Sequence, residues 1–462
     1  MFLKGRGMWY AMLLSGIVAL SHAATSQSAP QTTEPGRLTL LDLAGAEGVR
    51  ESVLSPDGST FALVRDGQIV LMPASGAWPR VLTSTVGSKS GLAWSPDGRS
   101  LAFLSEGAVW KVSAMGGDPV RLTEGRRGFG DPRTASDRDP QWSPNGRWLL
   151  FETGRRGHGD LGVVRADGTT QSLLTGDRGD QGSAAWSPDG TQIAFVERSP
   201  EHFSGRLLVG VFNNETGTLT TQPRALYVAA EDRGGGWSIR KPEWTRNGEG
   251  LLAILQETGW DKIYRIPVKG GSPVQITTGE SEDERPVVSP DGRSIAFVSN
   301  REHLETPAIW VVGLDGHGAH PLLKLSTGVN TAPQWAPDGR TLFFTHSSTF
   351  EPASLQSAAV SNGTPNYLLR SQPINFSNTG LPEPEVVHYK SKDGLPIAAV
   401  LYRPLHAETG KRHPGVLWIH GGPEGQDLLG GIRGLSIWHS EATSCSSQTT
   451  AEAVAMESTS AT

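Results

Sequence analysis

The sequence contains a single cysteine, Cys445, in 462 residues. No intrachain disulfide can form, so the fold must be held together by packing alone, even in an oxidising compartment. Helix-favouring runs of alanine, leucine, glutamate and lysine are also scarce, whereas glycine (57) and proline (31) are abundant. This composition is typical of many short strands joined by tight turns, and it predicts an all-β fold.

A basic stripe is missing as well. The 41 lysines and arginines are outnumbered by 47 aspartates and glutamates, and the net charge is −6. A surface without a concentrated positive field does not attract phosphates, so we expect no nucleic-acid partner. The histidines do not show the short helical spacing of a metal site, and we predict no metal and no cofactor. These histidines are His158, His202, His303, His317 and His320.

The N-terminus has the three-part pattern of a secretory signal. Two basic residues precede an apolar run over residues 8–20, and the small residues Ala23 and Ala24 follow it. We predict a signal peptide over residues 1–23 and a periplasmic or secreted protein. An uncleaved anchor is the alternative, but the apolar run is shorter than the ~20 residues of a spanning helix, so we expect no stable membrane insertion after cleavage.

One four-residue phrase occurs seven times, at intervals of 40 to 58 residues. The copies are SPDG at Ser55, SPDG at Ser95, SPNG at Ser143, SPDG at Ser187, TRNG at Thr245, SPDG at Ser289 and APDG at Ala336. Proline fixes φ at the second position, Asp or Asn tolerates the third, and glycine supplies the positive φ that the fourth requires. Each copy therefore predicts a hairpin turn.

Apolar alternation follows each phrase, and a tryptophan precedes five copies. These are Trp94, Trp142, Trp186, Trp244 and Trp335. A large ring at this position can fill the wedge between neighbouring sheets. Four short strands per period form one blade of a β-propeller. We predict seven blades over residues 37–370, built from WD40-like or TolB-like repeats, with an eighth only if residues 37–53 close the ring.

The longest interval, between the fourth and fifth copies, carries an insertion around residues 201–236. We expect a loop that projects from the propeller rim, where it could contact a protein partner. Loops vary freely, so an irregular connection without function is the favoured alternative.

An acidic run at Glu282, Asp283 and Glu284 has two interpretations. It could form an acidic rim that binds the amino terminus of a substrate. Charge runs usually stay in water, so we favour a solvated charged loop.

The repeat ends before a Pro- and Asn-rich linker at residues 371–385, and a second domain is predicted over residues 386–429. Within it, the apolar run 413–419 predicts a buried strand. This strand leads into His420, Gly421, Gly422 and Pro423. In α/β-hydrolases such a loop presents backbone N–H groups to an oxyanion, because glycine lets the backbone approach the substrate closely. Taken alone, the four residues could equally form a plain turn.

The order of these features resembles the prolyl oligopeptidase family of serine peptidases, especially its acylaminoacyl-peptidase and dipeptidyl-peptidase-like members. The SPDG repeats are followed by EPEVVHYKSKDGLPIAAVLYRP and then by HPGVLWIHGGPEGQ, so the resemblance spans residues 37–427. It implies a propeller that caps an α/β-hydrolase domain and restricts substrates to short peptides. It also implies a serine nucleophile with His and Asp partners, all downstream of the His-Gly-Gly-Pro loop.

No G-x-S-x-G sequence occurs in the 462 residues, and 39 residues follow Pro423. We therefore assign no catalytic residue, and His420, Gly421 and Gly422 with Pro423 remain oxyanion-loop candidates only. We expect a truncated, inactive chain that carries the first strands of an incomplete α/β-hydrolase domain. The alternative is a TolB-like periplasmic propeller that acts as a protein-binding module.

The C-terminal segment, residues 430–462, has neither a strand nor a helix period and predicts disorder. Suppose that each shifted codon takes the last base of one residue's codon and the first two bases of the next residue's codon. The codons of residues 437–457 can then spell LAQRGYVVLLPNYRGSSGYG. We interpret the segment as the out-of-frame translation of a hydrolase gene, with a frameshift near Gly430 or Gly431. Cys445 lies in this segment and is assigned no role.

Sequencing the gene tests this interpretation. We expect synonymous bases that preserve the hidden string throughout the segment. Bases that break the string, or a stop codon within it in the shifted frame, would rule out the frameshift.

Overall fold

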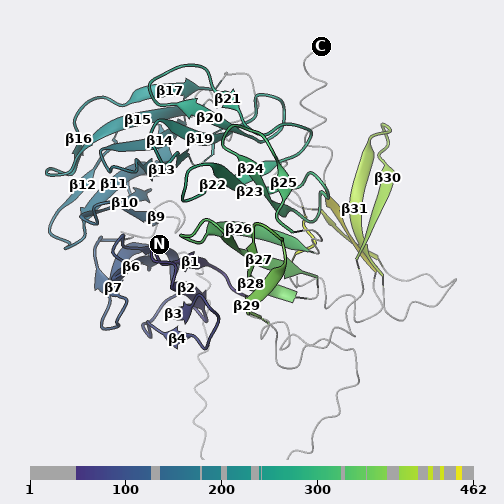
Figure 1. The fold of residues 1–462 in the computed structure, drawn as a ribbon, viewed down its shortest axis with the longest axis horizontal. Helices are drawn as coiled ribbons and strands as arrows, with labels where there is room; N and C mark the ends of the chain where they lie inside the picture. The colour runs from purple at the N-terminus through teal and green to yellow at the C-terminus, as the bar shows by residue number, and fades with distance from the viewer. Residues whose placement is uncertain are drawn as a thin grey trace, which may run out of the picture.

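The computed structural model describes most of the chain between residues 48 and 449. The described residues are 48–125, 136–176, 179–198, 205–229, 239–240, 242–323, 328–349, 351–371, 384–403, 415–419, 427–430 and 444–449. Every regular element in this part of the chain is a β-strand. Seven antiparallel sheets are arranged around a common axis, and each of them is a contiguous stretch of sequence (Figure 1). The predicted seven-bladed β-propeller is therefore confirmed.

Each blade contributes one strand to each of four concentric positions. The innermost strands are β1 (Ser52–Leu54), β5 (Ser90–Trp94), β9 (Asp137–Trp142), β13 (Asp180–Trp186), β18 (Glu243–Trp244), β22 (Asp283–Val288) and β26 (Val329–Trp335). The second strands are β2 (Thr60–Arg65), β6 (Ser100–Ser105), β10 (Trp148–Thr153), β14 (Gln192–Arg198), β19 (Gly250–Leu255), β23 (Ser294–Ser299) and β27 (Thr341–Ser348).

The third strands are β3 (Gln68–Pro73), β7 (Ala108–Ser113), β11 (Asp160–Arg165), β15 (Gly205–Asn213), β20 (Lys262–Pro267), β24 (Ala308–Gly313) and β28 (Glu351–Ala359). The outer strands are β4 (Arg80–Val81), β8 (Val120–Arg121), β12 (Gln171–Leu173), β16 (Thr218–Leu219), β17 (Arg224–Val228), β21 (Val274–Gln275), β25 (His320–Pro321) and β29 (Pro365–Leu369). Most outer strands are two or three residues long, which leaves little unpaired edge for another chain to join.

The SPDG phrase forms the turn between the first two strands, as predicted. In the fourth blade the Ser187 hydroxyl donates to Asp189 Oδ1 at 2.6 Å and accepts from the Gln192 N–H at 2.9 Å. Asp189 Oδ1 also accepts from the Thr191 N–H at 3.0 Å, and Gly190 has a φ of 68°. The hydrogen bond from Ser187 lowers the pKa of Asp189, which keeps the carboxylate ionised to hold the turn.

The seven turns contact one another around the ring. A side chain added to each turn glycine would lie against the corresponding residue of the preceding blade. The pairs are Gly58 with Pro337, Gly98 with Pro56, Gly146 with Pro96, Gly190 with Pro144, Gly248 with Pro188, Gly292 with Arg246 and Gly339 with Pro290. The first pair joins blade 1 to blade 7, so the contacts run around the whole ring.

The tryptophans before the turns link each blade to the one before it. All five indole N–H groups donate to a backbone carbonyl in the innermost strand of the preceding blade. The bonds are Trp94 to Val53 (3.1 Å), Trp142 to Ala93 (3.1 Å), Trp186 to Gln141 (3.3 Å), Trp244 to Ala185 (3.0 Å) and Trp335 to Val287 (3.0 Å). The rings therefore fill the predicted wedge and also satisfy their own polar group there.

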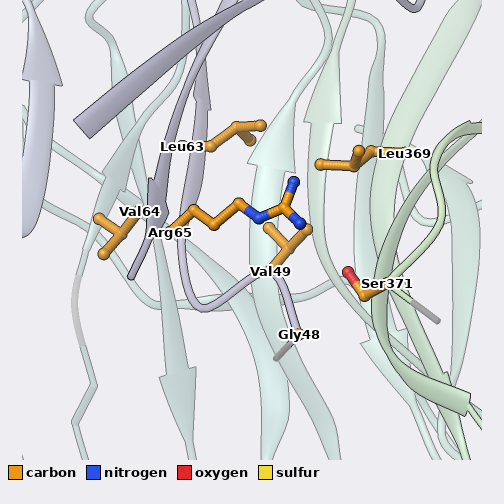
Figure 2. Close-up of a pocket in the computed structure, with 7 residues that line it drawn as sticks. All are labelled: Gly48, Val49, Leu63, Val64, Arg65, Leu369 and Ser371. Atoms are coloured by element: carbon orange, nitrogen blue, oxygen red, sulfur yellow. The ribbon is translucent and has the colours of Figure 1, made fainter. Parts of the chain in front are cut away.

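Blades 1 and 7 meet without exchanging a strand. The Gln334 side chain accepts from the Leu54 N–H and donates to the Ser52 carbonyl, both at 2.9 Å. Val49 and Leu369, where the chain enters and leaves the propeller, line a hollow of about 10 Å³ together with Arg65 (Figure 2). Because this volume holds no more than one water, the two ends of the propeller are packed side by side.

The insertion in blade 4 differs from the predicted loop. Residues 205–229 form β15, β16 and β17, and β15 pairs with both of the others. The extra residues lengthen the third strand to nine residues and add a fifth strand to the sheet. The remainder of the predicted insertion lies outside the described residues.

A separate sheet follows the propeller, with the strand order β30-β31-β33-β32. These strands are β30 (Glu385–Lys390), β31 (Pro396–Tyr402), β32 (Gly415–Ile419) and β33 (Ser444–Thr449). β32 and β33 are parallel, and the 420–443 connection is long enough for the crossover that parallel strands require. The segment that we expected to be disordered thus supplies a strand, because backbone pairing does not depend on the periodic side-chain pattern that it lacks.

The turn hydroxyl is expected to contribute to stability. Ser187→Ala should lower the free energy of unfolding by about 1 kcal/mol, because it removes the hydroxyl that bonds both the Asp189 carboxylate and the Gln192 N–H. Ala336→Ser should raise it, since blade 7 lacks the hydroxyl that the other blades carry. Urea unfolding of both variants checks this prediction, and equal shifts of the same sign would contradict it.

Candidate functional site

The predicted oxyanion loop, His420, Gly421, Gly422 and Pro423, lies outside the described residues. The strand that leads into it is present as β32, and the segment that follows it is described at residues 427–430. These two segments give the position of the predicted second domain relative to the propeller.

Residues 427–430 pack on the lower face of the propeller, which we define as the face opposite the seven turns, where the innermost strands begin. The Leu429 N–H donates to the Glu305 carbonyl of blade 6 at 2.8 Å. A Cβ on Gly430 would lie 2.8 Å from Val329 and 3.0 Å from Ser347, both in blade 7. Residues 427–430 therefore contact the lower face of blades 6 and 7.

The acidic run of blade 6 lies on this face, and our interpretation of it as a solvated loop is wrong for its central residue. Asp283 is fully buried, as is Lys262. The Lys262 ammonium donates to Asp283 Oδ2 at 2.9 Å, and Arg301 Nη2 donates to both carboxylate oxygens at 3.0 Å. A buried carboxylate needs such charged partners, and the sequence pattern alone does not show them.

Glu282 sits at the boundary between blades 5 and 6. Its carboxylate accepts from the Asp261 N–H at 2.6 Å, and its own N–H donates to Asn300 Oδ1 at 2.8 Å. The pKa of Glu282 is raised to about 7, chiefly by burial. The neighbouring charge of Asp261 also raises this pKa, and by more than the charge of Lys262 lowers it. This carboxyl group therefore changes its charge near neutral pH.

Arg240 joins two further carboxylates at the same boundary. Its guanidinium contacts Asp261 at 2.8 Å and Glu284 at 2.6 Å. Because half of the Arg240 side chain is exposed, this pair of contacts lies on the surface of the lower face. Blades 5 and 6 together hold a cluster of buried and half-buried carboxylates that are bonded to Lys262, Arg301 and Arg240.

Five innermost strands bulge at the same place, a feature that we did not predict. The residue three positions before the end of the strand has a positive φ in each of them. These residues are Gly91 (59°), Asp139 (47°), Ser183 (51°), Arg285 (50°) and Ala332 (52°). A proline directly after three of the five was a usable sequence signal, since proline is confined to bulges and edges within sheets.

Glutamates from neighbouring strands hold two of these bulges. The Glu51 carboxylate accepts from the N–H groups of Gly91 and Leu92 at 2.8 and 2.6 Å, and Glu152 accepts from Ser183 at 2.5 Å. Burial is the largest influence on Glu51 and raises its pKa. At these two bulges a carboxylate of the preceding blade therefore accepts from the backbone N–H groups that the bulge leaves out of the ladder.

The described residues contain no cluster of three metal-ligating side chains. They also contain no helix long and apolar enough to cross a membrane.

Comparisons with known proteins place this fold among propellers of two kinds. The family described as the TolB beta propeller domain matches residues 218–402. A TolB homolog of Chlorobium luteolum is 30% identical over 197 residues, which cover 43% of this chain and 38% of that protein. The uncharacterized peptidase YuxL of Bacillus subtilis is 28% identical over 124 residues, or 26% of this chain and 19% of the peptidase. This chain therefore aligns with less than half the length of either protein.

Among solved structures, a puromycin-hydrolyzing peptidase of Mycobacterium tuberculosis superposes with a TM-score of 0.73 at 18% identity. The match covers 90% of this chain and 68% of that peptidase. The predicted resemblance to propeller-bearing peptidases of the prolyl oligopeptidase type is thus confirmed at the level of the fold.

Glu282 makes stability depend on pH. Because its native pKa is about 7 and its ordinary value 4.5, the folded chain retains a proton that the unfolded chain releases between these values. Stability should therefore fall as pH rises from about 4.5 to about 7. Glu282→Gln keeps the hydrogen-bond acceptor and removes the titration, so its stability relative to wild type should increase across this window. Urea unfolding at pH 5, 6, 7 and 8 measures the difference, and a difference that stays constant with pH would contradict the assignment.

Proposed function

We propose that this chain is the propeller and the first hydrolase strands of an exported serine peptidase of the prolyl oligopeptidase type. Its substrates are short peptides, and its compartment is the periplasm or the cell exterior. The signal-like N-terminus supports export, and the fold of the peptidase neighbours supports the peptidase class.

One observation carries the proposal: the strand that leads into His-Gly-Gly-Pro belongs to a partly parallel sheet, and the segment that follows it contacts the propeller's lower face. β32 is parallel to β33, and Leu429 and Gly430, which follow the loop, contact blades 6 and 7. A propeller that only binds a partner at its rim needs neither a parallel sheet nor this contact. We propose that the backbone N–H groups near Gly421 and Gly422, which lie outside the described residues, act as the oxyanion donors.

We further propose that the chain by itself hydrolyses no peptide. No G-x-S-x-G sequence occurs in the 462 residues, and oxyanion donors cannot act without a nucleophile. In the proposed frame shift, the codons of residues 443–447 can read Val-Val-Leu-Leu. β33 lies between β31 and β32, a position where buried strands are usually apolar, whereas its translated sequence is SCSSQT. The shifted frame therefore supplies the side chains that this position in the sheet favours.

The second candidate is a protein-binding module, which the TolB match over residues 218–402 favours. It places the partner at the propeller rim and assigns no chemistry to the second sheet.

A labelling experiment separates the two candidates. The chain and a version with the frame restored near Gly430 are incubated with a serine-directed phosphonate and with short chromogenic peptides. We expect the restored version alone to be labelled and to cleave peptides, because it regains a nucleophile. The matched control is the restored version with the serine of its G-x-S-x-G sequence replaced by alanine.

Labelling of neither version would favour the binding module, provided that both retain the strand-rich circular dichroism of a propeller. Labelling of the original chain would overturn the proposal that it is inactive. Labelling of the alanine control would show that the phosphonate reacts elsewhere, and it would remove the support for the peptidase.

A further inference from the structure

A groove of about 500 Å³ lies between blades 2 and 3 on the turn-bearing face, away from the docked sheet. Its lining comes from the two SPDG-like turns, from β7 and from the Trp142 ring. The lining residues used below are Asp97, Ser100, Lys111, Trp142 and Ala166. This volume is in the range of small-molecule sites.

Lys111 lines this groove at a position where four other blades carry an aliphatic residue. In each blade, the last residue of the innermost strand pairs with one residue of the second strand. The next residue of the second strand pairs with the third-strand position compared here. The register places Leu71, Lys111, Val163, Val209, Arg265, Val311 and Ser357 at this position. The four aliphatic members are at least nine-tenths buried between blades. In blade 2 a half-buried ammonium group takes the place of an apolar contact.

Neighbouring gaps are closed by other means. Between blades 3 and 4, Asn214 hydrogen-bonds Asn145, the Gly190 carbonyl and the Trp148 indole at 2.8 to 3.0 Å. Between blades 1 and 2, Arg80 reaches across to the Ala114 carbonyl at 2.8 Å. At the groove between blades 2 and 3, the Lys111 ammonium donates to the Ala166 carbonyl, and the Trp142 indole donates to the Ala93 carbonyl.

The groove carries two opposite charges that do not pair with each other. The Lys111 ammonium has three donors and one protein acceptor, the Ala166 carbonyl, and forms no ion pair with a carboxylate of the described residues. Asp97 uses one oxygen, Oδ1, to hold its turn, and its other oxygen faces solvent. The hydrogen bond from Ser95 lowers the pKa of Asp97, so the carboxylate is ionised at neutral pH.

We propose that this groove binds a small zwitterion, a free amino acid or a short peptide, with its carboxylate at Lys111 and its ammonium at Asp97. Trp142 provides an apolar wall for the side chain, and the Ser100 hydroxyl makes no side-chain hydrogen bond that would prevent it from reaching the ligand. A concave, partly desolvated site strengthens both charge contacts relative to bulk water. The site is independent of the peptidase proposal, because it lies on the opposite face of the propeller.

Binding of L-leucine to the full chain tests the proposal, measured by ligand-observed NMR with calorimetry as confirmation. We expect a dissociation constant on the order of 1 mM, typical of a ligand with so few atoms. The matched ligands are 4-methylpentanoate, which lacks the ammonium, and 3-methylbutylamine, which lacks the carboxylate. Each should bind at least about tenfold more weakly, since each loses one charge contact. The affinity for dileucine, compared with that for leucine, distinguishes a site for short peptides from a site for free amino acids.

The variants are taken from the protein's own repeats, so their folding has precedent. Lys111→Leu installs the residue of blade 1, and Asp97→Asn installs the turn residue of blade 3. Lys111→Leu should abolish binding and Asp97→Asn should weaken it about tenfold. Arg265→Leu, at the matched position of blade 5, should leave it unchanged.

No saturable binding to wild type up to about 50 mM, fifty times the expected constant, would overturn the proposal. Binding that survives Lys111→Leu would overturn it too, as would equal affinity for leucine and its two single-charge analogues. Circular dichroism and thermal unfolding confirm that each variant retains the wild-type fold.

Discussion

The contact between turn glycines and prolines of successive blades is the constraint on which the rest of the structure depends. A glycine such as Gly190 lies so close to Pro144 that a Cβ would be 3.2 Å from the proline ring. The same contact joins Gly58 to Pro337 and closes the ring where no strand is shared. Because the turns fix one end of every blade, the tryptophan hydrogen bonds and the interblade cores fall into register behind them. The opposite face is left free to vary in charge and to meet the second sheet.

Much of the fold could be predicted because its signals are local. A Ser-Pro-Asp-Gly turn is defined by four adjacent residues, and Trp142 or Trp186 is recognised by its distance from the turn. Counting the turns gave the number of blades for the same reason. The insertion after β14 was misjudged because β17 pairs with β15, a contact that the interval between turns does not reveal.

The residues of the candidate site were harder to predict because their hydrogen-bond and ion-pair partners come from different blades. Asp283 resembles a surface residue in sequence, yet Lys262 and Arg301 reach it from positions 21 and 18 residues away. Glu282 acquires its unusual proton affinity from burial against Asp261 in the previous blade. A run of three acidic residues indicates neither that one of them is buried nor that its partner lies in another blade. The β33 pairing was missed because the segment lacks the alternation that identifies most strands.

Repetition has a further consequence for how this protein can change. Equivalent positions in the seven blades hold different residues in the same backbone setting: the turn serine is threonine at Thr245 and alanine at Ala336, and the turn proline is arginine at Arg246. Since every blade packs against similar neighbours, each such difference records a replacement that the architecture has already tolerated. The seven blades therefore show which substitutions a single backbone position of this fold can accept.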